Sequence, residues 1–155
     1  MSYLQQYWSV EREVTVAFNC FATDGKFARL DGVLHFPERG LTVLLEVDED
    51  QHVHYMVACD ARRMMDVTTA LMCSATATPH VLWVRFNPDT FMVDGVKQRI
   101  KTADRLQALH DFIANYQPVQ PVAIAYMFYD MLDGEPAVFA DADYDSSVKT
   151  LHVDF

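Results

Sequence analysis

The sequence has few of the residues on which several common kinds of site depend. Its three cysteines, Cys20, Cys59 and Cys73, are odd in number and form no CxxC pair. This argues against zinc bound through cysteine and favours reduced thiols in an intracellular compartment. The five glycines form no glycine-rich phosphate loop. No apolar run is long enough to span a membrane, and the N-terminus lacks the basic segment and apolar core of a signal peptide. We therefore expect a soluble protein of the cytoplasm or nucleus, without a membrane partner.

Basic residues are also scarce, since 12 Lys and Arg stand against 22 Asp and Glu and the formal net charge is −10. Such a balance argues against a generic nucleic-acid binder, because phosphate contacts need Lys and Arg. The acidity is concentrated, however. Residues 130–155 hold seven acids and a single base, Lys149, and so carry −6. Residues 1–129 would carry +1 without five further acids, Asp31, Glu46, Asp48, Glu49 and Asp50.

The 155 residues, of which 51% are hydrophobic, fit one domain with a substantial core. Apolar periodicity and turn residues predict a mixed sequence of strands and helices. The expected order is a short helix over 3–11, strands over 13–22, 27–36 and 41–47 with tight turns at 23–26 and 37–40, a helix over 57–72, a strand over 80–86, a hairpin around Asp94-Gly95, a helix with Thr102 as its N-cap, a strand over 122–129, and a final hairpin with strands at 137–139 and 148–153. We therefore predict an α/β fold in which an antiparallel three-strand meander, a crossover helix and a further parallel strand form a mixed sheet flanked by helices.

Carboxylates gather where the strand over 41–47 ends. Glu46 and Asp48 are two positions apart and so share one face of the strand, and Asp31 lies in the neighbouring strand of the meander. Like charges this close need compensation, and a hard divalent cation suits carboxylate oxygens. One interpretation is a site for Mg²⁺ or Mn²⁺ with Asp31, Glu46 and Asp48 as ligands; the other is a solvated acidic turn.

Side chains that follow this cluster offer further chemistry. Gln51 and His52 are candidates to position the attacking water or to accept its proton. Basic side chains on the 57–72 helix and beside the Asp94-Gly95 hairpin are candidates for phosphate contacts, or else form a solvated helix surface and a charged guard on an edge strand. These basic candidates are Arg62, Arg63, Lys97, Arg99 and Lys101.

The same residues carry a resemblance to a known superfamily. Asp31, fifteen residues ahead of Glu46-Val47-Asp48, resembles the PD-(D/E)xK nuclease signature. The run LEVDEDQHVHY, followed by CDARRMMDV and VLWVRFNPDTF, resembles uncharacterised nuclease-like proteins of large DNA viruses and some microbial eukaryotes. The order of these segments is also similar to that of the very short patch repair endonucleases. The resemblance covers roughly residues 27–96.

The resemblance implies a restriction-endonuclease-like fold and a magnesium-dependent endonuclease acting on nucleic acid, DNA in the first place, with Asp31 and Glu46 as metal ligands. It also implies a virus-encoded protein as one possible source. Asp48 stands where the family has a lysine, and an aspartate cannot stabilise the negative charge that develops during hydrolysis. Gln51 or His52 then supplies the missing function, or the chain is an inactive member of the fold that serves as a binding or structural module.

Two interpretations remain for the acidic segment 130–155. In one, it is a solvated edge hairpin whose charges prevent aggregation. In the other, it lies against the basic region 97–101 and competes with nucleic acid until a protein partner displaces it. The partner of the chain could also be a second copy of itself, in a homodimer.

Overall fold

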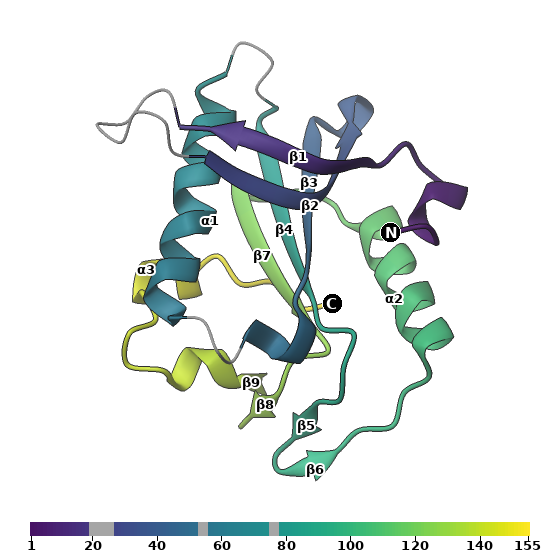
Figure 1. The fold of residues 1–155 in the computed structure, drawn as a ribbon, viewed down its shortest axis with the longest axis vertical. Helices are drawn as coiled ribbons and strands as arrows, with labels where there is room; N and C mark the ends of the chain where they lie inside the picture. Colours follow the sequence, from purple (N-terminus) through teal and green to yellow (C-terminus); the bar gives the residue numbers. More distant parts are fainter. Residues whose placement is uncertain (19–26, 53–55, 75–77) are drawn as a thin grey trace.

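The centre of the molecule is a five-stranded mixed sheet with the strand order β1-β2-β3-β4-β7 (Figure 1). β1, β2 and β3 form the predicted antiparallel meander, whereas β3, β4 and β7 are parallel. The strands are β1 (Glu11–Ala17), β2 (Phe27–Phe36), β3 (Leu41–Val47), β4 (His80–Phe86) and β7 (Val122–Met127). The α/β class and the mixed sheet are thus confirmed. The computed structural model describes residues 1–18, 27–52, 56–74 and 78–155, so the turn predicted over 23–26 lies outside the described residues.

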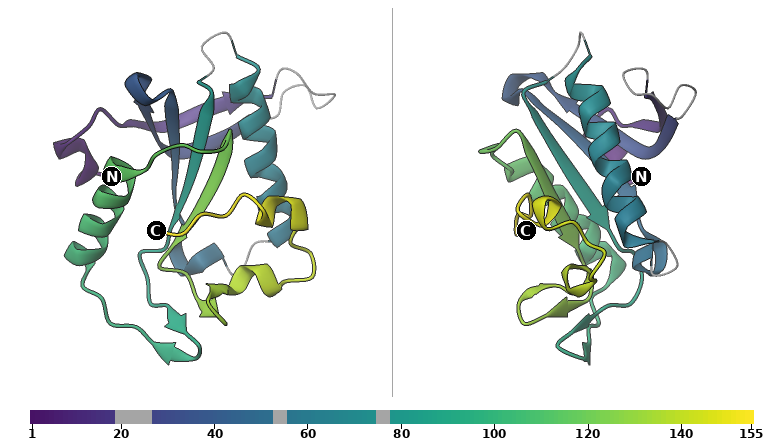
Figure 2. Two further views of the ribbon diagram at one scale, coloured as in Figure 1. Left: turned by 180° about the vertical axis from the view of Figure 1, so that it is seen from behind. Right: turned by 90° about the vertical axis from the view of Figure 1, so that its left-hand side faces the viewer.

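Two long helices cover the two faces of this sheet (Figure 2). α1 (Val57–Met72) joins β3 to β4, and α2 (Thr102–Asn115) joins β4 to β7. Alternate residues of β3 serve the two faces: Leu44 packs with α1, whereas its neighbours Val43 and Leu45 pack with α2. The nearly continuous apolar character of β3 and β4 follows from this burial on both sides.

The turn between β2 and β3 also fastens α2. Pro37–Arg39 forms a short 3-10 turn, and Gly40 ends it in the left-handed region with φ 57°. The Arg39 guanidinium donates hydrogen bonds to the carbonyl oxygens of Ile113, Ala114 and Tyr116, at 2.9, 3.3 and 3.2 Å. These carbonyls close the C-terminal end of α2, where intrahelical donors run out. A turn of the meander therefore caps a helix that follows more than sixty residues later.

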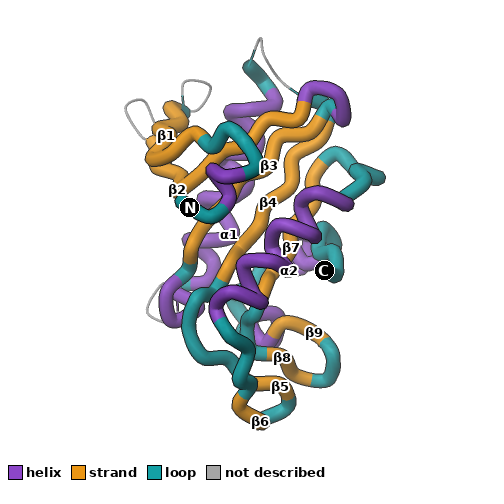
Figure 3. Tube along the Cα trace, turned by 90° about the vertical axis from the view of Figure 1, so that its right-hand side faces the viewer, coloured by secondary structure: helices purple, strands orange, loops and turns teal. Residues whose placement is uncertain are grey.

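A second, small sheet lies beyond the carboxyl ends of β4 and β7 (Figure 3). Its order is β6-β5-β8-β9, and the Asp94-Gly95 hairpin predicted from sequence forms β5 and β6. The acidic segment does contain a hairpin, β8 and β9, but it precedes the residues predicted to form its strands, and β8 pairs with β5. The strands are β5 (Met92–Val93), β6 (Val96–Lys97), β8 (Met131–Leu132) and β9 (Glu135–Pro136).

Several local expectations were wrong. The residues over 137–139 and 148–153 do not form strands; the chain there holds a 3-10 turn, η4 (Ala137–Ala140), and a short helix, α3 (Ser146–Lys149). The side chain of Asp145 accepts a hydrogen bond from the Ser147 amide at 2.8 Å and so starts α3 as an N-cap. Thr102 is the first residue of α2 rather than its N-cap, which is Lys101.

The N-terminal segment departs from expectation in a similar way. In place of a helix over 3–11, a single 3-10 turn, η1 (Leu4–Gln6), precedes β1, which already begins at Glu11. Leu4 is buried in the α2-side core, so packing of one apolar residue replaces a full helical face. Within the described parts of the chain, no helix combines the length and apolar character needed to cross a membrane.

Candidate functional site

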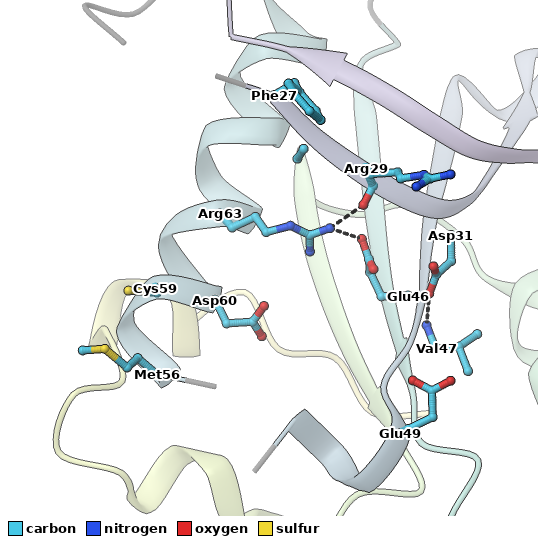
Figure 4. Close-up of a pocket in the computed structure, with 11 residues that line it drawn as sticks. Phe27, Arg29, Asp31, Glu46, Val47, Glu49, Met56, Cys59, Asp60 and Arg63 are labelled. Atoms are coloured by element: carbon cyan, nitrogen blue, oxygen red, sulfur yellow. Dashed lines mark hydrogen bonds and ion pairs between the residues drawn. The ribbon is translucent and has the colours of Figure 1, made fainter. Parts of the chain in front are cut away.

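A pocket opens where β2 leaves β3. β2 is paired with β3 only from Gly32 to Phe36, whereas its first residues, from Phe27 onward, are paired with β1 alone. In Figure 1, the end of β1 and the start of β2 lie beside α1, and β2 runs from there toward its pairing with β3. The space between the start of β2, the end of β3 and the first turns of α1 is a pocket of about 510 Å³ (Figure 4). It is lined by Phe27, Ala28, Arg29, Asp31, Glu46, Val47, Glu49, Met56, Cys59, Asp60 and Arg63.

Asp31 and Glu46, the first two residues of the predicted metal site, both line this pocket. The Oδ2 atom of Asp31 accepts a hydrogen bond from the Val47 amide at 2.8 Å, beyond the last ladder pair between the two strands. Glu46 is only 5% exposed although it lines the pocket. Two carboxylates that are fifteen residues apart in the chain therefore meet at one edge of the sheet.

The Glu46 carboxylate is poorly compensated for its burial. The pKa of Glu46 is raised to about 7: burial is the largest cause, the nearby charge of Asp31 adds to it, and Arg63 and Arg85 oppose it. A carboxyl group with this pKa takes up a proton near neutral pH. A further cation beside it would favour the ionised form.

Arg63 spans the gap between the diverging strands. Its Nη2 atom donates to Glu46 Oε1 at 2.9 Å and to the carbonyl oxygen of Arg29 at 2.6 Å (Figure 4). The first contact is to β3 and the second is to β2, so the guanidinium links the two strands across the opening between them. The phosphate-binding candidate Arg63 therefore lies in the pocket itself, and its side chain remains 30% exposed there.

Asp48, the third predicted ligand, does not line the pocket. Its side chain is fully buried and accepts hydrogen bonds from Arg85 Nε at 2.6 Å, Arg85 Nη2 at 3.0 Å and the Tyr129 hydroxyl. Burial raises the pKa of Tyr129 well above its usual value, so the phenol stays protonated and donates to Asp48. The structure thus separates Asp48 from Asp31 and Glu46 by placing it in a buried ion pair with Arg85.

Asp60 and Glu49 line the pocket in its place, and neither was among the sequence candidates. Asp60 lies in the first turn of α1, and its Oδ2 atom accepts a hydrogen bond from Arg85 Nη1 at 2.6 Å. A signal for Asp60 existed in the sequence, because a residue three positions before Arg63 shares its helix face. With Asp31, Glu46, Glu49 and Asp60 against Arg29 and Arg63, the lining carries four acids and two bases, a formal charge of −2.

Gln51 and His52 were predicted to position the attacking water or to accept its proton. The Gln51 amide is engaged with Asp130: its Nε2 donates to Asp130 Oδ1 at 3.1 Å, and its Oε1 accepts from the Asp130 amide at 2.6 Å. Gln51 also lies outside the lining of the large pocket. The side chain of His52 is outside the described part of the structure, so its role stays a prediction.

The remaining basic candidates lie apart from the pocket lining. Arg62 is 79% exposed and forms an ion pair with Asp66, one turn along α1, at 3.5 Å. Lys97, Arg99 and Lys101 are exposed on and after β6. The acidic segment does not lie against them as a whole, since Asp143 and Asp145 line a separate cavity beside Arg62.

The three segments that carried the resemblance contact one another. Arg85 connects Asp48, at the end of β3, with Asp60 on α1. The Asp89 Oδ2 atom accepts from the Asp50 amide at 3.0 Å, and the Asn87 side chain donates to the Phe128 carbonyl at 2.8 Å. The two ion pairs of Arg85 and the Asp50–Asp89 hydrogen bond thus link the three segments to one another.

The grouping of potential metal ligands bears on the predicted site for a divalent cation. Among residues 1–18, 27–52, 56–74 and 78–155, no three His, Cys, Asp or Glu side chains are grouped so that they could hold a metal ion. Mg²⁺ commonly keeps several waters and binds through one or two carboxylates, so a site made by Asp31 and Glu46 alone stays a prediction.

Comparison with known proteins adds no relative: no protein-family model matches the chain, and no curated protein or solved structure does.

Proposed function

We propose that the protein is a metal-dependent nuclease that hydrolyses phosphodiester bonds in nucleic acid. The proposal rests above all on the meeting of Asp31 and Glu46 in one pocket at the edge of β3. The resemblance to PD-(D/E)xK nucleases attaches to these two residues. The antiparallel meander, the crossover helix α1 and the parallel strand β4 match the order of elements that this resemblance implies, and so support a restriction-endonuclease-like fold.

Charge balance also supports a divalent cation. The pocket lining carries a formal charge of −2, which one Mg²⁺ or Mn²⁺ would neutralise. Asp31 and Glu46 would hold this ion, with water as the remaining ligands. Bound there, the metal would activate a water molecule and stabilise negative charge on the phosphate.

The protein's own side chains have distinct tasks under this proposal. Arg63 holds Glu46 in place and presents a partly exposed guanidinium, whose several N–H groups suit a phosphate oxygen. It thereby supplies positive charge that Asp48, in the position of the family's lysine, cannot supply. Arg85 positions Asp60 at the pocket wall.

A second candidate is an inactive member of the fold that binds a partner. The observation in its favour is that the two carboxylates at the end of β3 already have arginine partners, Arg63 for Glu46 and Arg85 for Asp48. Such pairing gives the chain a stable structure without a metal.

Cleavage assays separate the two candidates. Wild type is incubated with DNA and with RNA in Mg²⁺ and in Mn²⁺, beside Asp31→Asn, Glu46→Gln and a matched control, Glu38→Gln, an exposed carboxylate on the turn before β3. We expect cleavage by wild type and the control and a loss of roughly 10²–10³-fold in the two pocket variants, the usual cost of removing one group that stabilises transition-state charge. Absence of cleavage of both nucleic acids with both ions would leave the binding module as the function.

A further inference from the structure

Two large apolar side chains at the rim of the pocket are exposed to solvent. Phe27 is 64% exposed and Met56 is 69% exposed, and both line the pocket. In Figure 4 they lie on opposite sides of the charged residues, Phe27 at the start of β2 and Met56 before α1. Within the described residues, Phe27 takes part in no aromatic ring contact, in contrast to Phe155, the other exposed phenylalanine, which packs edge-on against Phe112 and Phe128.

The position of Phe27 follows from the alternation of β2. Ala28 and Leu30 are buried in the core beneath α1, with Ala28 also bordering the pocket, while Phe27, Arg29 and Asp31 occupy the alternate positions and line the pocket. An aromatic ring, a cation and a carboxylate therefore follow one another along one strand. The carbonyl oxygen of Arg29 is also tied to Arg63, so this row is joined to the proposed catalytic carboxylate Glu46.

We infer that Phe27 is a stacking platform for an unpaired base, and that the substrate is therefore single-stranded or locally unpaired nucleic acid. The inference rests on the proposed function and names its substrate class. An aromatic ring stacks on the face of any base, but a base inside a duplex presents only its edges in the grooves. A pocket of about 510 Å³ is of the size that takes a small molecule, and a nucleotide unit is of that class.

Charge argues against a long duplex contact. Duplex binding needs a row of Lys and Arg along the phosphates, and this chain has 12 bases against 22 acids. The pocket lining holds two bases, and both already have a carboxylate partner: Arg29 pairs with Glu13 and Arg63 with Glu46. A short footprint, with one phosphate near Arg63 and one base on Phe27, agrees with this composition.

Binding is measured before cleavage, so that the two proposals are tested apart. The probes are a short oligodeoxynucleotide that contains 2-aminopurine, whose fluorescence is quenched by stacking, and the same strand annealed to its complement. Wild type is compared with Phe27→Ala, with Phe27→Trp, and with Leu132→Ala, a half-exposed apolar residue on β8 that does not line the pocket. Thermal unfolding of each variant shows that it is folded.

We expect wild type and Leu132→Ala to prefer the single strand and to quench 2-aminopurine. Phe27→Ala should weaken single-strand binding by roughly 5- to 100-fold, the range for loss of one base–aromatic stack, and Phe27→Trp should restore it. The inference would be overturned if single strand and duplex bind equally well and Phe27→Ala binds them as wild type does. It would also be overturned if neither probe binds. Phe27-dependent binding without any cleavage would support the inference and count against the nuclease proposal, whereas cleavage that ignores Phe27 and strandedness would do the reverse.

Discussion

Glu46 and Asp48 stand two residues apart at the end of β3, yet they lie in opposite surroundings. Asp48 is fully buried and is met by Arg85 and the Tyr129 hydroxyl. Glu46 borders an open pocket, shares Arg63 with a backbone carbonyl, and has its pKa raised to about 7. Both carboxylates have an arginine partner, but only Asp48 receives hydrogen bonds on both of its oxygens.

The difference shows what separates a structural carboxylate from a reactive one in this molecule. A buried carboxylate persists as an ion only when it is paired and hydrogen-bonded, and Asp48 meets that condition. Glu46 meets it in part, so its ionised form remains available to a further cation. Divergence of β2 from β3 produces this contrast, because it opens the space beside Glu46 while Arg85 and Tyr129 enclose Asp48.

Replacing the arginine partner of each carboxylate is the strongest test of the contrast between Asp48 and Glu46. Arg85→Met leaves Asp48 and Asp60 without their cation in the interior, and we expect a loss of about 3–5 kcal/mol in the free energy of unfolding. Arg63→Met leaves Glu46 able to take up a proton at the pocket, so we expect a loss of about 1 kcal/mol or less. Urea unfolding of both variants measures the difference, with the exposed Arg62→Met as the control. Equal losses for Arg85 and Arg63 would contradict the contrast.

The pH dependence of stability sharpens the same contrast. The pKa of Glu46 is raised from 4.5 to about 7, so between these pH values the folded protein holds a proton that the unfolded chain has released. The stability due to protonated Glu46 is complete below pH 4.5 and is lost as the pH rises through 7. Relative to Glu46→Gln, wild type should lose up to about 3 kcal/mol from pH 4.5 to 8, at about 1.4 kcal/mol per pH unit of displacement.

Urea unfolding of wild type and Glu46→Gln over this pH range measures the effect. Glu38→Gln controls for removal of an exposed carboxylate and should follow wild type. Parallel curves for wild type and Glu46→Gln would show that the pocket does compensate the Glu46 charge.

The smallest expected effect is that of the metal on stability. At ten times its Kd, Mg²⁺ or Mn²⁺ should stabilise the folded protein by about 1.4 kcal/mol and raise the Tm by roughly 3–6 °C. Glu46→Gln should abolish the rise, and the rise should shrink below pH 7 because Glu46 must first release its proton. Differential scanning fluorimetry with Lys97→Gln as the control tests this. No shift in wild type at millimolar metal would refute a cation held by Asp31 and Glu46.

Local patterns in the sequence were sufficient for most of the sheet. The strands β2, β3 and β4 have the predicted limits of 27–36, 41–47 and 80–86, because long apolar runs bounded by turn residues leave few alternatives. The Asp94-Gly95 hairpin formed for a similar local reason. The patterns misled at 137–139 and 148–153, where short apolar runs fit a strand or a turn equally well and packing of Phe139 and Val148 decided the outcome.

The sequence by itself determined that Asp31 and Glu46 lie on adjacent strands and that Glu46 and Asp48 share a face, because both facts follow from the two-residue period and a tight turn. Only the tertiary structure decided that Asp48 leaves the site and that Asp60 and Arg63 enter it. Strand periodicity states which face a side chain occupies but not what covers that face. Here Asp48 is paired with Arg85, thirty-seven residues further along the chain, and hydrogen-bonded by Tyr129.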